Sequence, residues 1–253
     1  MTLAIDLRES VAVVTGGSRG IGAAIVRLLH TAGASVFFTY ATRGDEANAL
    51  ATQLGERAAC ARCDVTDGAS LPGLVDACVA RFGGLHTLVN NAGIFERNPF
   101  DGDDFAAWRA GWRRTFDVNL FGAADLSWAA MRHMRANGGG RIINIASRTA
   151  HRGELEHADY GASKAALINL TKSIARTYAK NAVLAFAVAP SFIETEMAAH
   201  DLALHRAEIV AEIPLGRVAS PDDVAGIVAF LASPMADYLN GATIDVNGGS
   251  YVR

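Results

Sequence analysis

Short apolar runs alternate along the chain with longer segments in which apolar residues recur at helical spacing. Residues 10–15 read Ser-Val-Ala-Val-Val-Thr. This run predicts a buried strand, because a strand that is covered on both faces of its sheet has a continuous apolar run. Residues 21–29 carry apolar side chains every three or four positions, which predicts a helix. Further strands are predicted at 35–40 and 85–89, so the pattern indicates an α/β protein.

The turn between the first predicted strand and helix is rich in glycine, since residues 15–22 read Thr-Gly-Gly-Ser-Arg-Gly-Ile-Gly. In a strand-turn-helix unit, glycines at this spacing allow a tight turn, the approach of a pyrophosphate to the backbone, and close packing of helix on strand. We assign these roles, in order, to Gly16, Gly20 and Gly22. The motif predicts a dinucleotide site, with a glycine-rich turn that binds nothing as the alternative.

The end of the second predicted strand bears on the choice of dinucleotide. An NAD-binding fold of this kind usually places a carboxylate there to accept from the ribose hydroxyls. Residues 40–43 read Tyr-Ala-Thr-Arg and contain no carboxylate. Arg19 and Arg43 can instead bind a 2′-phosphate through their guanidinium groups. We therefore predict NADP(H), with NAD(H) less favoured and Tyr40 at the position of the missing carboxylate.

Two later strand ends carry further candidates for the cofactor site. Asp64 follows the third predicted strand and can accept from an adenine amino group, while Val65 can pack on the ring. The fourth strand ends in Asn-Asn-Ala-Gly at 90–93. Small residues there let a sugar and a phosphate lie against the backbone, and an asparagine amide can tie neighbouring strands together.

A serine, a tyrosine and a lysine in the middle of the chain carry the candidate chemistry. Tyr160 and Lys164 share one face of a predicted helix, because their spacing is i, i+4. A nearby ammonium stabilises a phenolate, so we expect Lys164 to lower the pKa of Tyr160. Ser147 follows the apolar run 141–146 and can hold a substrate oxygen while Tyr160 transfers a proton. Taken alone, Tyr-x-x-x-Lys also arises by chance on exposed helices.

Composition and charge exclude several classes of protein. The chain has 253 residues, of which 51% are hydrophobic and 19% charged, so we expect one domain over 1–253. The net charge of −3 offers no clustered positive face for nucleic acid. We see no signal peptide and no apolar run that approaches the roughly 18 residues of a membrane span. We therefore expect a cytoplasmic protein with no membrane or nucleic-acid partner.

The three cysteines do not indicate a metal site or a disulfide framework. Cys60 and Cys63 have the spacing of metal ligands, but neither a second cysteine pair nor a nearby histidine accompanies them. Cys78 makes the number odd. We expect no metal.

With these motifs, the chain resembles the classical short-chain dehydrogenase/reductase family over nearly its entire length, including members like the 3-oxoacyl-acyl-carrier-protein reductases. The motifs that carry the resemblance occur in family order and spacing: Thr15–Gly22, Asp64-Val65, Asn90–Gly93, Asn119, Ser147, Tyr160-x-x-x-Lys164 and Phe192–Thr195. The resemblance implies a single-domain Rossmann-type three-layer sandwich, with a seven-stranded parallel sheet in the order 3-2-1-4-5-6-7 and helices on both faces.

The resemblance also implies roles for individual residues. Asn119 would position a water that connects Lys164 to solvent, and Lys164 would also bind the cofactor ribose. Thr195 would bond the nicotinamide carboxamide. The implied cofactor-binding residues are Gly16, Ser18, Arg19, Gly20, Ile21, Gly22, Tyr40, Arg43, Asp64, Val65, Asn91, Ala92, Gly93, Tyr160, Lys164, Pro190, Ile193 and Thr195. The family usually has Pro-Gly where this chain has Pro190-Ser191, so the turn beside the nicotinamide is expected to differ.

The predicted function is an NADP(H)-dependent oxidoreductase that interconverts a carbonyl, either a ketone or a 3-oxo group, and a secondary alcohol. Tyr160 would be the general acid and base, Ser147 would orient the oxygen, and Lys164 and Asn119 would support them. A sensor or scaffold that binds NADP(H) without turnover is the alternative. A pure binder has no need of the acid, so the complete set of four residues disfavours it.

The sequence says less about the substrate than about the reaction. A lid is expected at about 191–214. Gly138 and Asn181 stand where carrier-protein reductases use basic residues to dock their carrier, so we favour a small free carbonyl compound over a carrier-bound 3-oxoacyl group, although Lys180 and Arg141 lie close by and keep the question open. Four polar residues before Tyr160 are either solvated or recognise a polar or anionic substrate: His151, Arg152, Glu154 and His157.

The family resemblance finally implies a homotetramer, with its largest interface formed by the helices near Asn119 and Tyr160. The segment 94–118 is a few residues longer than in compact members, and we expect it to shape either a pocket rim or a subunit contact.

Overall fold

One parallel sheet lies at the centre of the computed structural model, which describes residues 5–253. Its seven strands are in the order β3-β2-β1-β4-β5-β6-β7, which confirms the predicted topology. The strand bounds are β1 Val11–Val14, β2 Ser35–Tyr40, β3 Ala58–Arg62, β4 Thr87–Asn90, β5 Gly140–Ile145, β6 Val183–Pro190 and β7 Thr243–Val246. The strand order reverses between β1 and β4, and ligands of such sheets bind outside the strands' carboxyl ends at this point.

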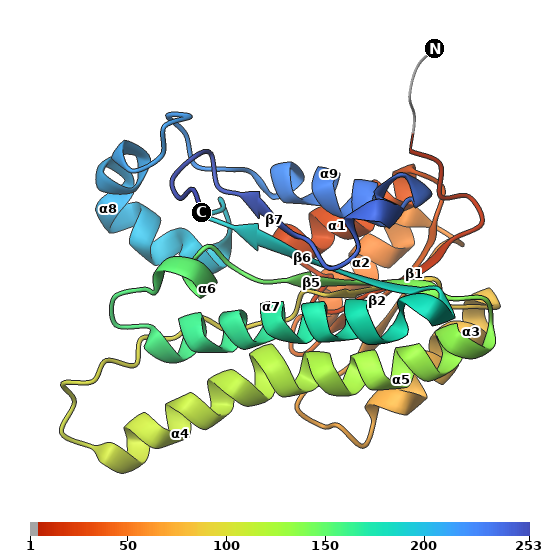
Figure 1. The fold of residues 1–253 in the computed structure, drawn as a ribbon, viewed down its shortest axis with the longest axis horizontal. Helices are drawn as coiled ribbons and strands as arrows, with labels where there is room; N and C mark the ends of the chain where they lie inside the picture. The colour runs from red at the N-terminus through yellow and green to blue at the C-terminus, as the bar shows by residue number, and fades with distance from the viewer. Residues whose placement is uncertain (1–4) are drawn as a thin grey trace.

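Helices cover both faces of the sheet (Figure 1). One face is covered by α1 Gly20–Thr31, α2 Gly44–Leu54 and α9 Pro221–Leu231. The other is covered by α3 Leu71–Phe82, α5 Gly122–Ala136 and α7 Ala158–Tyr178. Helix α4 Phe105–Phe116 continues into α5 through a π-helical turn, η1 Asp117–Phe121. The shorter elements are α6 Thr149–Arg152, η2 Ala179–Asn181, η3 Glu196–Ala198, α8 Ala199–Ala211 and η4 Pro234–Leu239.

The alternation of apolar runs and helical stripes explains the two cores. Each strand presents alternate side chains to opposite faces of the sheet. Val13 of β1 therefore packs with the α3 and α5 residues, while Val14 packs with α1 and α9, and both are fully buried. These two apolar layers fix the sheet, and with it the strand ends that carry the predicted site residues.

A chain of buried side-chain hydrogen bonds joins β4, β5 and α7. Asn90 at the end of β4 donates from its amide to Asn144 Oδ1 of β5 at 2.8 Å, and Asn144 donates to Thr171 Oγ1 of α7 at 2.8 Å. Asn90 is thus an asparagine that ties neighbouring strands, as its motif predicted. The connection fixes α7, which carries the candidate catalytic residues, against the centre of the sheet.

The segment expected to form a lid folds into η3 and a bent helix. Within α8 the backbone of His205 leaves the helical region, with φ −127° and ψ 19°. A small apolar cluster holds this segment: Ala198, Leu202, Ile209, Ile213 and Val218. Whether it moves as a lid stays a prediction.

Over residues 5–253 the structure contains no helix with both the length and the apolar character needed to cross a bilayer. In the same residues no three metal-ligating side chains come together, and Cys60, Cys63 and Cys78 are free thiols.

Candidate active site

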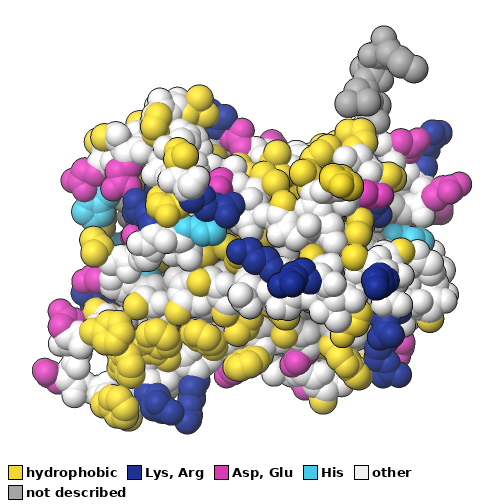
Figure 2. Space-filling view, viewed as in Figure 1, with side chains coloured by type: hydrophobic (Ala, Val, Ile, Leu, Met, Phe, Trp, Pro, Cys, Tyr) yellow, Lys and Arg dark blue, Asp and Glu magenta, His cyan; other side chains and the backbone are white. Residues whose placement is uncertain are grey.

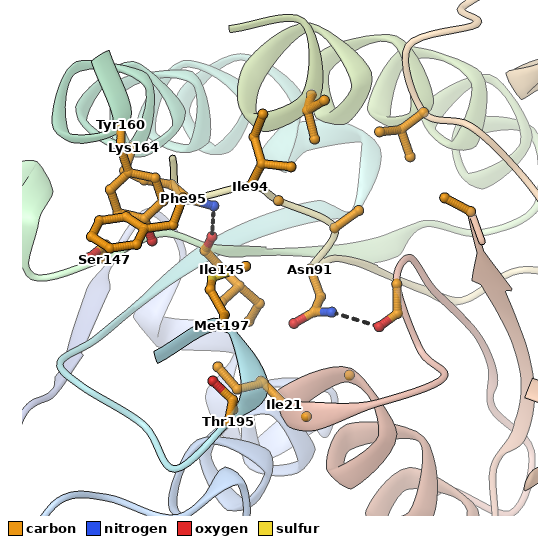
Figure 3. A pocket seen from close by; sticks show the side chains of 18 of the residues that line it. Ile21, Asn91, Ile94, Phe95, Ile145, Ser147, Tyr160, Lys164, Thr195 and Met197 are labelled. Carbon is orange, nitrogen blue, oxygen red and sulfur yellow. Dashed lines mark hydrogen bonds between the residues drawn. The ribbon is translucent and has the colours of Figure 1, made fainter. Parts of the chain in front are cut away.

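A cavity of about 1140 Å³ opens at the carboxyl ends of the strands. All eighteen residues predicted to bind the dinucleotide line it, and so does Ser147. Figure 3 shows how Ser147, Tyr160 and Lys164 lie together on one side of the cavity, with Ile21 and Thr195 on another. Asn119 is the one predicted site residue that does not line the cavity.

The glycine-rich turn forms a cradle that side chains would fill. Gly16 has φ +63°, a left-handed conformation that favours glycine. A Cβ on Gly22 would lie 2.1 Å from the carbonyl oxygen of Gly16, so no other residue fits there without a shift of the backbone. Helix α1 begins at Gly20, and a helix N-terminus attracts anions through its free N–H groups and its dipole. This geometry fits a pyrophosphate.

Asn91 joins this turn to the end of β4. Its side-chain amide donates to the carbonyl oxygens of Thr15 at 2.9 Å and Gly16 at 3.1 Å. In return, the Thr15 hydroxyl oxygen accepts from the backbone N–H groups of Asn91 and Ala92 at 3.0 Å and 2.9 Å. The two loops at the reversal of strand order are therefore one hydrogen-bonded unit.

Arg19 and Arg43 lie together at one end of the cavity, and both pair with the same carboxylate. Arg19 binds Glu196 of η3, and Arg43 Nη2 lies 3.1 Å from Glu196 Oε2. Arg43 also pairs with Glu46 at 2.8 Å. The two predicted phosphate-binding arginines thus converge on a single anionic group, which here is supplied by the chain itself. Sequence reasoning missed Glu196, because nothing near η3 in the sequence indicates contact with residues so far away in the chain.

Lys164 is buried beneath the cavity. Its Nζ donates to the carbonyl oxygen of Ile145 at 2.8 Å, a contact drawn in Figure 3, and lies 5.7 Å from the centre of the Tyr160 ring. Burial lowers the pKa of Lys164 to about 8. Burial also raises the pKa of Tyr160 to about 12, with interaction with Ser147 opposing the shift and the charge of Glu154 adding to it.

The expectation that Lys164 lowers the pKa of Tyr160 is wrong for this structure. Loss of hydration disfavours the charged form of both groups, and for the phenol this effect outweighs the hydrogen bond with Ser147, which lowers the pKa. Part of the Tyr160 side chain still faces the cavity, so the phenol is accessible from the site.

Asn119 lies in the π-helical turn between α4 and α5, where its amide fixes the loop after β4. Its Oδ1 accepts from the N–H of Ile94 at 2.8 Å, and its Nδ2 donates to the Ile94 carbonyl at 3.0 Å and to Ser163 Oγ at 3.2 Å. The position of a Cβ on Gly93 would be 3.2 Å from Asn119 Oδ1 and 3.4 Å from Lys164 Nζ. Asn119 and Lys164 therefore meet at Gly93, while the water relay stays a prediction.

The four polar residues before Tyr160 differ in what they contact. His157 stacks on Phe95 at 3.8 Å between ring centres, and Phe95 meets the edge of Tyr160 at 4.8 Å, so His157 supports the site from behind. His151 faces Tyr251 and Asp245 rather than the cavity. Of the four, only Glu154 lines the cavity.

Arg148 was not predicted as a site residue, although it follows Ser147 directly. Its side chain is 2% exposed and lines the cavity, and burial lowers the pKa of its guanidinium group. Its place beside Ser147 was the signal that could have identified it. The burial of a charged side chain there has no signature in the sequence.

Comparisons with known proteins give concordant results. A family model described as enoyl-(acyl carrier protein) reductase matches residues 16–251. The chain is 43% identical to cis-4-hydroxycyclohexanecarboxylate dehydrogenase of Sinomonas cyclohexanicum, over 95% of this chain and 96% of that one. It is 40% identical to the 3-oxoacyl-acyl-carrier-protein reductase FabG of Vibrio cholerae, over 98% and 100%. The crystal structure of a short-chain dehydrogenase/reductase (glucose/ribitol dehydrogenase) from Brucella melitensis is similar, with a TM-score of 0.91 and 33% identity over 99% of this chain and 100% of that one.

Proposed function

Because the chain belongs to the classical short-chain dehydrogenase/reductase family, we propose that it is an NADP(H)-dependent oxidoreductase that interconverts a ketone and a secondary alcohol. The observation that carries the proposal is that Ser147, Tyr160 and Lys164 line one cavity with all the predicted dinucleotide-binding residues. NADPH, when bound, supplies the hydride for the carbonyl carbon.

In the proposed mechanism the chain's own residues bind the oxygen and move the proton. Ser147 holds the carbonyl oxygen by hydrogen bond, and the Tyr160 phenol donates its proton to that oxygen as hydride arrives. With its pKa raised to about 12, the phenol carries a proton at neutral pH, as the acid in carbonyl reduction must. Lys164, fixed by Ile145, would bind the ribose hydroxyls, and a water positioned by Asn119 would connect Lys164 to solvent.

The substrate we propose is a small free carbonyl compound. One relative is named for cis-4-hydroxycyclohexanecarboxylate, and the other for a 3-oxoacyl group on an acyl carrier protein. The identities to the two differ by only three percentage points, 43% and 40%, so they do not decide the question. Gly138 and Asn181, in the places of the family's carrier-docking basic residues, support the free compound. The cytoplasmic location stays a prediction from the sequence.

Substitution of Tyr160 tests the mechanism. Tyr160→Phe should lower kcat by about 10²–10⁴-fold, because a positioned general acid typically contributes that much, and should leave dinucleotide affinity nearly unchanged. Steady-state assays on a panel of ketones, with dinucleotide titrations, measure both quantities. Tyr178→Phe, at the far end of α7, is the matched control. A variant that kept more than about a tenth of the rate would remove Tyr160 from this role, and wild-type binding without any turnover would favour a sensor.

Substitution of Arg19 and Arg43 tests the choice of cofactor. A charge-assisted hydrogen bond contributes about 1.5–3 kcal/mol, which solvent exposure reduces. Arg19→Ala combined with Arg43→Ala should raise the KM for NADPH at least tenfold and leave the KM for NADH nearly unaltered. Arg206→Ala, another exposed and paired arginine, serves as the control. A wild-type preference for NADH, or equal weakening with both cofactors, would contradict the phosphate-binding role.

We also propose a homotetramer, and a surface on α4 and η1 supports it. Figure 2 shows hydrophobic side chains gathered over α4. We define the aromatic face as Phe100, Phe105, Trp108, Trp112, Phe116 and Phe121, which line or flank a hollow of about 450 Å³. Phe100 is 71% and Phe105 is 67% exposed. Exposed apolar patches of this kind mark protein contacts, and this face lies on α4 and η1, next to Asn119, in one of the two helical regions predicted to join subunits.

A further inference from the structure

We propose that Arg148 and Thr149 form an anion-binding subsite in the cavity, and that the substrate therefore carries a carboxylate in addition to its carbonyl group. The inference deepens the proposed function, because it names a substrate class for the same site. It begins from polar atoms that lack partners. In residues 5–253, ten side-chain nitrogen or oxygen atoms are buried without a hydrogen-bond partner. Only two of them, Arg148 Nη1 and Thr149 Oγ1, belong to residues that line the cavity.

The backbone and side chain of Arg148 are fixed in place, but its guanidinium group has no hydrogen-bond acceptor among the described residues. Its backbone N–H donates to the carbonyl oxygen of Pro190 at 2.8 Å, and its guanidinium carbon lies 5.7 Å from the centre of the Phe192 ring. The nearest carboxylate oxygen, Glu212 Oε2, is 3.7 Å from Arg148 Nη1, whereas the same oxygen accepts a hydrogen bond from Arg152 at 3.1 Å. Buried charges in proteins are normally paired and hydrogen-bonded, so the Arg148 guanidinium retains capacity to bind an acceptor.

The surrounding charges do not fill that capacity. Glu154 also lines the cavity, but it pairs with Arg152 at 3.5 Å. Arg148 and Arg152 together balance Glu154 and Glu212, so the cluster has little net charge to attract an anion over long distances. Recognition must come from short hydrogen bonds, and the planar fork of a guanidinium matches the two oxygens of a carboxylate. The Thr149 hydroxyl can add a third donor.

The subsite lies next to the candidate chemistry. Arg148 follows Ser147 in the chain, and the backbone N–H of Thr149 donates to Ser147 Oγ at 3.2 Å. The hydroxyl that orients the carbonyl and the two groups that would hold the carboxylate are thus on one turn of backbone. A substrate held at both points would be fixed relative to Tyr160, which is how positioning contributes to rate.

The test compares two ketones that differ in charge, 4-acetylbenzoate and its methyl ester. Wild-type kcat/KM should favour the carboxylate at least tenfold, mainly through KM. Arg148→Met should lower kcat/KM for the carboxylate at least tenfold and leave the ester within twofold, while Arg148→Lys should retain part of the preference. Arg206→Met is the surface control. Equal efficiency on acid and ester in the wild type would overturn the inference, even if Arg148→Met failed to fold.

A binding measurement separates this inference from the proposed function. Calorimetry should detect benzoate, but not benzamide, binding to the wild type, with the benzoate signal lost in Arg148→Met. Benzoate binding through Arg148 without turnover of any ketone would support the subsite and refute the oxidoreductase. Turnover that depends on Tyr160 but shows no preference for the acid would support the oxidoreductase and refute the subsite. Equal binding of benzoate and benzamide, or binding of neither, would also refute it.

Discussion

Lys164 and Tyr160 lie about one helical turn apart. Burial favours the neutral form of both side chains, so it lowers the pKa of Lys164 and raises the pKa of Tyr160. At pH 8 about half of the Lys164 side chains are therefore neutral, while Tyr160 holds its proton. The phenol therefore carries the proton that carbonyl reduction needs. In the direction of alcohol oxidation the phenol must first lose that proton, which higher pH favours.

The shifted pKa of Lys164 gives the protein a measurable pH dependence of stability. Between pH 8 and 10 the unfolded chain keeps a proton on Lys164, at its ordinary pKa of 10.5, that the folded protein has lost. The free energy of unfolding therefore rises with pH across this interval, by about 2 kcal/mol from this group. Urea unfolding at both pH values should show a rise in the wild type that exceeds that of Lys164→Met by this amount. Equal slopes would mean that Lys164 keeps its ordinary pKa.

The sequence spacing was enough to predict which residues form this site, but not the pKa shifts or the ion pairs that those residues have in the structure. The i, i+4 relation of Tyr160 and Lys164 was visible in the sequence, because helical periodicity brings such residues to one face. The direction of the Tyr160 shift depends on how much of the phenol is buried, which depends on Phe95 and other residues remote in the chain. The same limit applies to Glu196, whose partners lie more than 150 residues away.

Among the elements, α7 and the centre of the sheet are joined by polar as well as apolar contacts. The amide of Asn144 on β5 connects Asn90 on β4 with Thr171 on α7, and Asn144 is fully buried. Apolar contacts alone would tolerate sliding of a helix over a strand, whereas directional hydrogen bonds permit one register. The position of Tyr160 over the sheet thus depends partly on a residue that does not touch the cavity.

Substitution of Asn144 tests this connection. Asn144→Ala removes two buried hydrogen bonds and leaves a small cavity, so it should lower the free energy of unfolding by about 2–3 kcal/mol. Urea unfolding measures the loss. Asn169→Ala, at an exposed position of α7, should change stability by less than about 0.5 kcal/mol. A similar small effect at Asn144 would show that apolar packing alone fixes the helix.

The strands were easier to predict from the sequence than the π-helical turn that connects α4 with α5. The runs at 10–15 and 85–89 match β1 and β4 to within two residues at each end, because buried parallel strands have continuous apolar sequences. The π-helical turn at Asp117–Phe121 was not predicted. One additional residue in a helical turn leaves the apolar pattern almost unchanged, and such turns often occur at functional sites, as this one does around Asn119.

At the scale of the whole molecule, the aromatic face is an apolar surface that remains exposed in a single chain. Trp108, Trp112 and Phe116 follow one another at i, i+4 along α4, with ring centres 5.6 Å and 5.9 Å apart. Rows of this kind normally face a protein core or a partner. Phe100 and Phe105 contact the Trp108 ring but remain 71% and 67% exposed, which is consistent with the proposed assembly of identical chains.

Assembly through this face can be measured directly. Light scattering of the wild type at micromolar concentration should give the mass of a tetramer. Phe100→Ser combined with Trp112→Ser should raise the dissociation constant at least tenfold, because central aromatic residues often contribute more than 2 kcal/mol to an interface. Tyr238→Ser, at a fully exposed aromatic residue elsewhere, should have no effect. A monomeric wild type would refute the tetramer.

The bond of Glu196 to both Arg19 and Arg43 has a consequence for how the two halves of the cavity communicate. If a 2′-phosphate binds these arginines as proposed, it competes with Glu196 for their N–H groups. Each exposed pair contributes about 0–1 kcal/mol, so the phosphate can displace the carboxylate at small cost. Glu196 begins η3, which leads into α8, so its release frees the start of the segment beside the substrate. NADH, without the phosphate, would leave it in place. The identity of the cofactor would then be communicated to the substrate entrance by thermodynamic linkage.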